Sequence, residues 1–183
     1  VMGVNITVLV RFLTFFGYIT YISFLGKEHL GMSTIAVGLV LGSKSVTSLV
    51  GSLQSGRLAF RMHTALVMLV SFLIAAAGLL LIGVFPSVTT LAVGSVLYGV
   101  GDGIMSPVQK SLINILSAKD VRAGSIAFST GIGNLGKALA PGTMALVLTL
   151  FNMPAIFTAT GIISLIAAMV SGWIYYGMKR TSS

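Results

Sequence analysis

The chain lacks cysteine entirely and contains only three acidic residues among its 183 positions. Without cysteine there can be no disulfide, thiolate metal site or cysteine nucleophile. Charged residues make up 8% of the chain, whereas soluble domains carry about 25%. Because 56% of the residues are hydrophobic and the mean hydropathy is +1.04, most of this chain must have lipid as its solvent.

The few charges are mostly positive, with 11 Lys and Arg residues and a net charge of +8. A basic soluble protein would suggest a nucleic-acid partner, but such proteins gather their bases in one patch or stripe. Here the bases are scattered, and several interrupt apolar stretches. Basic membrane proteins are common because cytoplasmic loops retain Lys and Arg. We therefore predict a lipid bilayer as partner and no nucleic acid.

Six segments have the roughly 20 mostly apolar residues that a membrane helix needs. Strands are excluded because the segments are too long and do not alternate polar with apolar residues. Pro107 and Pro141 could divide the fourth or fifth segment. We predict one all-α integral membrane domain over residues 1–183, a bundle with helices at residues 6–25, 32–55, 65–85, 88–116, 123–151 and 155–177.

The connections between these segments differ in charge. The second and fourth connections and the C-terminal tail hold the bases Arg57, Arg61, Lys119, Arg122, Lys179 and Arg180, and the remaining connections hold only Lys27. The positive-inside rule places the basic set in the cytoplasm. We therefore predict a multi-pass protein of the cell membrane with both termini cytoplasmic. Since the chain begins at Val1 and shows no signal-peptide pattern, we expect it to be part of something longer.

Four segments also carry a polar face, and charged residues lie deep within them. Lys44, Asp102 and Lys137 fall near the middle of their segments, and Arg11 lies roughly 8 Å from a helix end. A charge at the bilayer centre costs about 2.5–3.5 kcal/mol on insertion scales. Asp102 could form a structural ion pair with Lys44 or Lys137. Alternatively, these side chains line a substrate or proton pathway, for which the candidates are Arg11, Tyr18, Lys44, Tyr98, Asp102, Gln109, Asn134 and Lys137.

The bases outnumber the acid within the predicted membrane segments. Either an anionic substrate or carboxylates from a missing partner could balance this excess, and the sequence does not decide between them. The first three and last three segments start in opposite directions, as an inverted 3+3 repeat requires. The third and sixth segments carry no charge, and we expect them to face lipid.

Four short stretches resemble a known family. Residues 56–63 are similar to the cytoplasmic loop motif G-x-L-A-D-R-x-G-R of the major facilitator superfamily, matching at Gly56, Leu58, Ala59 and Arg61; Arg57 fills the variable position. Phe60 stands where the family has Asp, which weakens any gating role. Residues 97–107, 120–124 and 133–142 resemble the Gly-rich tenth helix, the R-G start of the eleventh and its G-x-x-x-G-P pattern.

This resemblance implies helices seven to twelve of a twelve-helix transporter, most similar to drug–proton antiporters. The first and fourth segments would then line a central cavity, and the second and fifth would face a missing N-terminal half or a second copy of this chain. The implied function is proton-coupled efflux of a small molecule by alternating access, with no cofactor. Asp102 is the candidate proton carrier because it is the only carboxylate within the segments.

Membrane enzymes and channel-like or structural proteins are the alternative classes for such a bundle. An intramembrane protease needs a buried Ser–His pair or two carboxylates at depth, and the sequence provides neither, so we do not expect an enzyme. No motif with metal-ligand spacing is present. A standalone half-transporter, or a structural or channel-like homo-oligomer, stays open as an alternative.

Overall fold

The computed structural model describes residues 2–181, which form six long α-helices and no strand. Short helical turns join some of them, a π-helical turn at Leu25–His29 and a 3₁₀ turn at Lys119–Val121. This architecture confirms the predicted all-α bundle. The helices are α1 (Met2–Phe24), α2 (Thr34–Arg61), α3 (Thr64–Val84), α4 (Val88–Leu116), α5 (Arg122–Leu150) and α6 (Met153–Thr181).

The two helices with a proline in their interior, α4 and α5, are continuous. Pro107 lies inside α4 and Pro141 inside α5, so neither residue divides its helix as the sequence had left possible. Membrane helices tolerate proline because neighbouring groups can satisfy the freed carbonyl. The start of α4 is well defined, since Ser87 and Thr90 form a reciprocal capping box. Continuous helices matter here because α4 and α5 carry Asp102 and Lys137.

Helices α1, α2 and α6 are longer than the apolar segments that suggested them, and the first two extensions bear on the predicted site. Helix α1 begins at Met2, which places Arg11 about 14 Å along the helix rather than the roughly 8 Å expected. Helix α2 continues to Arg61, so Gly56, Arg57 and Arg61 lie in its last turns rather than in a connection. Arg, Leu and Ala are good helix formers, so α2 continues past Ser55, where the apolar segment ends.

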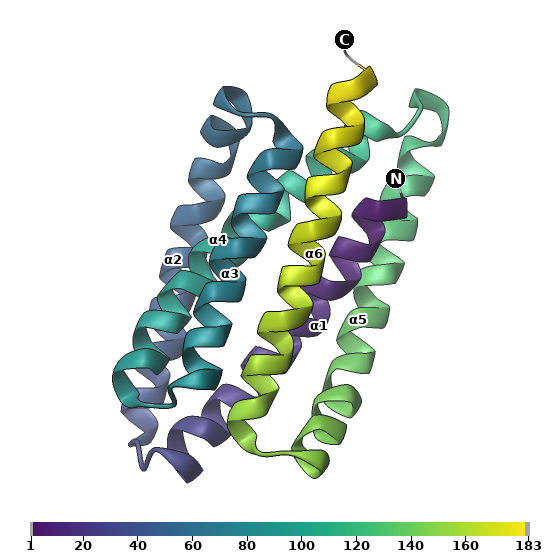
Figure 1. Cartoon of the computed structure of the whole chain (residues 1–183). Helices are drawn as coiled ribbons and strands as arrows, with labels where there is room; N and C mark the ends of the chain where they lie inside the picture. Colours follow the sequence, from purple (N-terminus) through teal and green to yellow (C-terminus); the bar gives the residue numbers. More distant parts are fainter. Residues whose placement is uncertain (1, 182–183) are drawn as a thin grey trace.

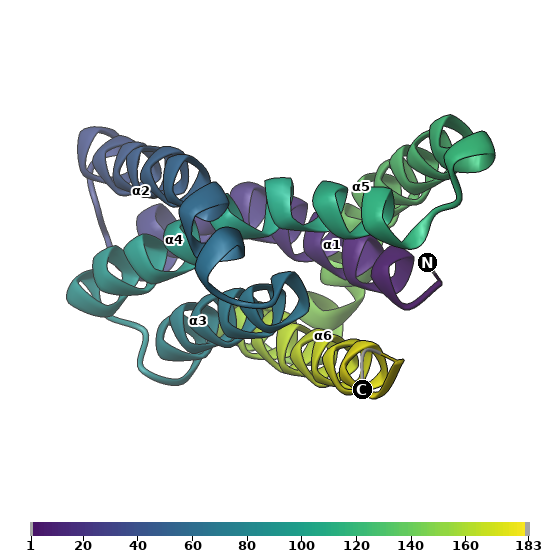
Figure 2. The same cartoon turned by 90° about the horizontal axis from the view of Figure 1, so that it is seen from above.

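The packing shows the expected inverted repeat. Helix α1 packs mainly against α5 and α6, just as α4 packs mainly against α2 and α3, and α3 packs against α6. Figure 1 shows α1 and α4 running in opposite directions along the bundle. Seen from above in Figure 2, α1 and α4 lie between an α2/α5 side and an α3/α6 side. The two groups of three are therefore joined mainly by the packing of α3 on α6, and α1 and α4 make a smaller contact beside it.

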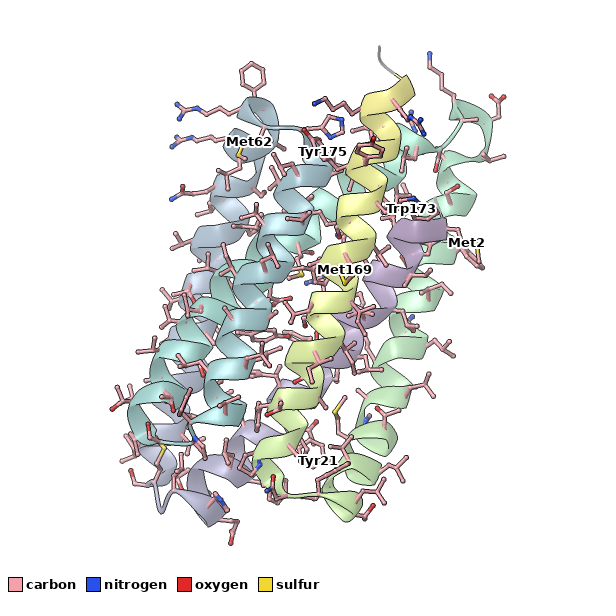
Figure 3. The ribbon with its side chains drawn as sticks, viewed as in Figure 1. Met2, Tyr21, Met62, Met169, Trp173 and Tyr175 are labelled. Atoms are coloured by element: carbon pink, nitrogen blue, oxygen red, sulfur yellow. The ribbon has the colours of Figure 1, made fainter. Side chains whose placement is uncertain are left out.

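The helices differ in how much of their surface the bundle covers. Helix α3 is more than half buried, against α4 and α6, so only part of it can face lipid as expected. Helix α2 is mostly uncovered and presents apolar side chains such as Leu39 and Leu53. On α6 the exposed apolar side chains include Met169 and Trp173, which Figure 3 labels. A bundle with so much apolar surface requires lipid or another protein around it.

Five of the helices in the described chain are long and apolar enough to span a membrane by length and composition: α1, α2, α3, α4 and α6. Helix α5 is not among them, because Gly, Ser, Thr and Lys137 dilute its apolar residues. Its length of 29 residues still matches its neighbours. A helix of this length and reduced hydropathy is typical of one that contacts protein or a polar cavity rather than lipid alone.

Candidate functional site

The centre of the bundle contains a charged triad in which one carboxylate binds two bases. Asp102 on α4 accepts a hydrogen bond from Nε of Arg11 on α1 at 3.0 Å and from Nζ of Lys44 on α2 at 2.8 Å. The side chains are 4%, 14% and 7% exposed, respectively. Each carboxylate oxygen therefore has its own cationic donor, and the triad joins three helices that are far apart in sequence.

Glycines on either side of Asp102 bring α2 close enough for this contact. A Cβ atom at Gly99 would lie 2.5 Å from the carbonyl oxygen of Lys44, and one at Gly103 would overlap the backbone of Ser48. Because neither glycine has a side chain, the α2 backbone rests directly on α4. The Gly-rich stretch around Asp102 thus has a local function, which is to let the ammonium group of Lys44 reach the carboxylate.

Aromatic rings surround the bases of the triad. The ammonium nitrogen of Lys44 lies 4.2 Å from the ring centroid of Phe15 and 5.5 Å from that of Tyr98. The guanidinium carbon of Arg11 lies 5.0 Å from the ring centroid of Phe12. Cation–π contacts of this kind contribute about 0.5–2 kcal/mol each. They help to hold a site whose two bases and one acid leave an excess positive charge.

Two buried tyrosines pack beside the triad. The rings of Tyr18 on α1 and Tyr98 on α4 lie 4.7 Å apart, and the Tyr18 hydroxyl is within 2.8 Å of Ser95 Oγ, to which it donates. Both side chains are almost fully buried. They join α1 to α4 in this conformation, and the sequence-based prediction that they line a pathway stays a prediction.

A cavity of about 450 Å³ opens between α1, α4 and α5. Four residues that were predicted for a pathway line this cavity: Arg11, Gln109, Asn134 and Lys137. Gln109 donates a hydrogen bond to Thr7 Oγ1 at 3.2 Å. A second recess of about 390 Å³ lies over the triad, between α1, α2 and α4. Arg11 and Ser106 line both spaces, so Arg11 connects the triad to the larger cavity.

Lys137 is the predicted alternative partner of Asp102, and the structure places it elsewhere. Its ammonium nitrogen lies 4.8 Å from the ring centroid of Phe12 and 5.9 Å from that of Phe16. It forms no ion pair with any residue in the described chain. The partner of Asp102 that the sequence did not suggest is Arg11, whose depth was underestimated because α1 begins earlier than expected.

The sequence of α1 contains a signal for the aromatic part of the site. Phe15 lies four residues after Arg11 on the same face of α1, and Phe12 and Phe16 share the adjacent face at the same spacing. These three rings contact the bases Arg11, Lys44 and Lys137. The other predicted group, Gly56, Arg57 and Arg61, is exposed at the end of α2 and does not join the triad.

A further cavity differs in chemistry from these two charged spaces. It has a volume of about 630 Å³, lies between the N-terminal halves of α1 and α5, and is lined by apolar side chains such as Met2 and Phe128, with no charged residue. The smaller recess over the triad contains all three of its charges. The chemistry of the site is therefore concentrated around Arg11.

An apolar six-helix bundle with an ion triad between its two repeats is the architecture of a membrane transporter half. Comparison with known proteins agrees: residues 7–183 match the family model of the Major Facilitator Superfamily. The chain belongs to this family, as the sequence motifs had indicated. No curated protein sequence matches it.

Solved structures with the same fold include two transporters. The POT family transporter PepTSo, in an in meso crystal structure, superposes with a TM-score of 0.82 at 18% identity over 97% of this chain. Tetrameric PepTSo2 superposes with a TM-score of 0.79 at 17% identity over 98% of this chain. The alignments cover 37% and 40% of those two chains, so this chain spans about two fifths of their length.

Proposed function

We propose that this chain is one half of a secondary transporter that exports a small molecule in exchange for protons. The observation that supports this is the triad of Arg11, Lys44 and Asp102 at the junction of the two repeats. Secondary transporters place their substrate and coupling sites near the membrane midplane, at the interface between repeats.

The triad provides a physical link between proton binding and helix movement. Helix α1 packs mainly on α5 and α6, and α4 mainly on α2 and α3, and these two groups meet chiefly where α3 packs on α6. The bond from Arg11 to Asp102 is a charged link between the same two groups on the α1–α4 side. A proton on Asp102 would remove the charge that holds Arg11 and Lys44 together. The two bases would then repel each other, which favours separation of α1 from α4.

The rest of the transporter is part of the proposal. The uncovered faces of α2 and α5 carry apolar side chains such as Leu39, Leu53, Phe128 and Leu146. We infer that they meet a second six-helix half, supplied by another segment of the polypeptide or by a second copy. Alternating access would then arise from rocking of the two halves around the central site.

The distribution of bases supports the proposed orientation in the cell membrane. Met2, Met62 and Tyr175 lie toward the same end of the bundle in Figure 3, and Tyr21 lies toward the other. The former end holds Arg57 and Arg61 at the end of α2 and Lys179 near the end of α6. An end rich in Lys and Arg is cytoplasmic by the positive-inside rule, so both described ends of the chain would lie in the cytoplasm.

The test is transport by the natural polypeptide in proteoliposomes with an acidic interior, using labelled tetraphenylphosphonium and naphthalene-1-sulfonate as cationic and anionic probes. We expect accumulation of one probe that collapses with the pH gradient. Asp102→Asn should abolish uphill accumulation, and Asp120→Asn, a change to the exposed carboxylate before α5, should have no effect. Undiminished uphill transport by Asp102→Asn with the same pH dependence would contradict the proposed coupling.

A further inference from the structure

Every charged residue that lines the cavity between α1, α4 and α5 is a base. Arg11, Lys110 and Lys137 face it from three different helices, and no acidic residue of the described chain contributes to its wall. The carboxylate of Asp102 lines the neighbouring recess and is already bonded to two cations. The cavity therefore has a positive electrostatic potential that the described protein does not neutralise.

Arg11 has unused hydrogen-bonding capacity at the edge of this cavity. Its bond to Asp102 uses Nε, and neither of its terminal nitrogens has a hydrogen-bond acceptor within the described chain. A guanidinium group has five N–H donors arranged to bind planar anions with two parallel bonds. The terminal nitrogens of Arg11 can thus bind a second anionic group while Nε stays on Asp102.

Lys137 in the second repeat corresponds to Lys44 in the first, but the two lysines have different partners. Helix α5 packs on α1 as α2 packs on α4, and both α2 and α5 carry a buried or half-buried lysine toward that partner. Lys44 of α2 finds the carboxylate of Asp102 on α4. Lys137 of α5 finds only the rings of Phe12 and Phe16 on α1. One repeat therefore supplies the counter-ion of its lysine, and the other does not.

The remaining wall suits a small organic molecule. The volume of about 450 Å³ falls within the range of about 300–1,000 Å³ that is usual for small-molecule sites. Phe12 and Ile113 provide apolar surface, and Asn134 and Thr130 provide neutral hydrogen-bonding groups. Asn114 also lines the cavity, and its buried Oδ1 atom has no hydrogen-bond partner in the described chain. The wall therefore offers an acceptor besides its cationic donors.

From these features we propose that the cavity is an anion subsite, in which Lys137 and the terminal nitrogens of Arg11 bind the carboxylate or sulfonate group of an organic substrate. This rests on the proposed transport function and narrows its substrate class to organic anions. The apolar part of such a substrate would contact Phe12 and Ile113. Its anionic group would supply the counter-ion that the repeat lacks, and Arg11 would communicate substrate binding to Asp102.

The natural polypeptide, purified in detergent, tests this with three probes of the same shape: 1-naphthoate, its neutral amide and 1-naphthylmethylammonium. We expect naphthoate to bind at least about tenfold more tightly than the amide, which is the effect of one charge-assisted hydrogen bond in a partly buried site. Lys137→Gln should remove that preference, and Lys137→Arg should retain it. Lys119→Gln, at an exposed lysine outside the cavity, should bind like the wild type.

Binding of the amide to Lys137→Gln, unchanged within about twofold, shows that this variant is folded and that only the charge has been lost. Equal affinity for naphthoate and its amide, no binding of naphthoate, or a preference for the ammonium probe would each overturn the anion subsite. A preference for the cation would mean that a carboxylate from the rest of the polypeptide neutralises these bases. Asp102-dependent transport of tetraphenylphosphonium, combined with indifference to naphthoate, would overturn the subsite and leave the proposed function standing.

Discussion

Replacing Asp102 by Asn removes one charge but leaves two bases without a counter-ion. Arg11 and Lys44 bind different oxygens of the same carboxylate at 3.0 and 2.8 Å, and all three side chains are buried or nearly so. Breaking a buried ion pair by removing one partner costs about 3–5 kcal/mol, chiefly because the remaining charge is still buried. We therefore expect Asp102→Asn to lower the free energy of unfolding by at least about 3 kcal/mol.

A second substitution, at Lys44, should restore part of the lost stability. Lys44→Met removes the more buried base and keeps an unbranched side chain only one atom shorter. The double variant then has only Arg11 left unpaired, and Arg11 borders the cavity. The double variant should be more stable than Asp102→Asn alone by about 1–3 kcal/mol, a coupling within the range for directly interacting residues. Unfolding in detergent, followed by the accessibility of an introduced cysteine, measures all four members of the cycle. Additive losses, with a double variant less stable than either single one, would refute the claim that the stability of the triad depends on paired charge.

Two further substitutions test how the site is built. Gly103→Ala should destabilise the bundle by about 1–3 kcal/mol, since its methyl group overlaps the backbone of Ser48. Gly42→Ala is the control inside α2: a Cβ atom there has nothing within 4 Å, and the substitution should leave stability unchanged or raise it by up to about 1 kcal/mol, because Ala is the better helix former. An equal loss for both variants in thermal unfolding would contradict the close α2–α4 contact. Tyr18→Phe removes the hydrogen bond to Ser95 and should cost about 1 kcal/mol while leaving helix content by circular dichroism unchanged. No loss of stability in Tyr18→Phe would mean that this bond contributes nothing to joining α1 and α4.

The sequence predicted the helical class and the family because both depend on local patterns. Runs of apolar residues locate α4 at residues 88–116, where the structure also has it, since a capping box and a terminal serine delimit that run. The same criterion ended α2 too early, at Ser55, although Arg57 and Arg61 continue the helix. Hydrophobicity is therefore a good guide to burial in lipid and a poor guide to where a helix stops once it leaves the apolar layer.

The partners of Asp102 could not be chosen from sequence because three bases lie at compatible depth and ion pairing depends on helix packing. Gly99 and Gly103 decide the matter by bringing α2 onto α4, which favours Lys44. Lys137 is excluded because α5 packs on α1, where Phe12 and Phe16 occupy the space beside its ammonium group. These are contacts between residues far apart in the chain, and no local pattern encodes them.

Two bases on one carboxylate allow one ion pair of the triad to weaken while the other holds. In a simple ion pair, a substrate that attracts the base leaves the carboxylate buried without a partner, which is strongly unfavourable. Asp102 has two donors, so an anionic group on the terminal nitrogens of Arg11 can draw the guanidinium toward the cavity while Lys44 stays bonded at 2.8 Å. A weaker bond from Arg11 Nε to Asp102 would loosen the connection between α1 and α4 without leaving the carboxylate unpaired. Substrate binding and proton binding would then act on the same contact, which is what coupling of the two requires.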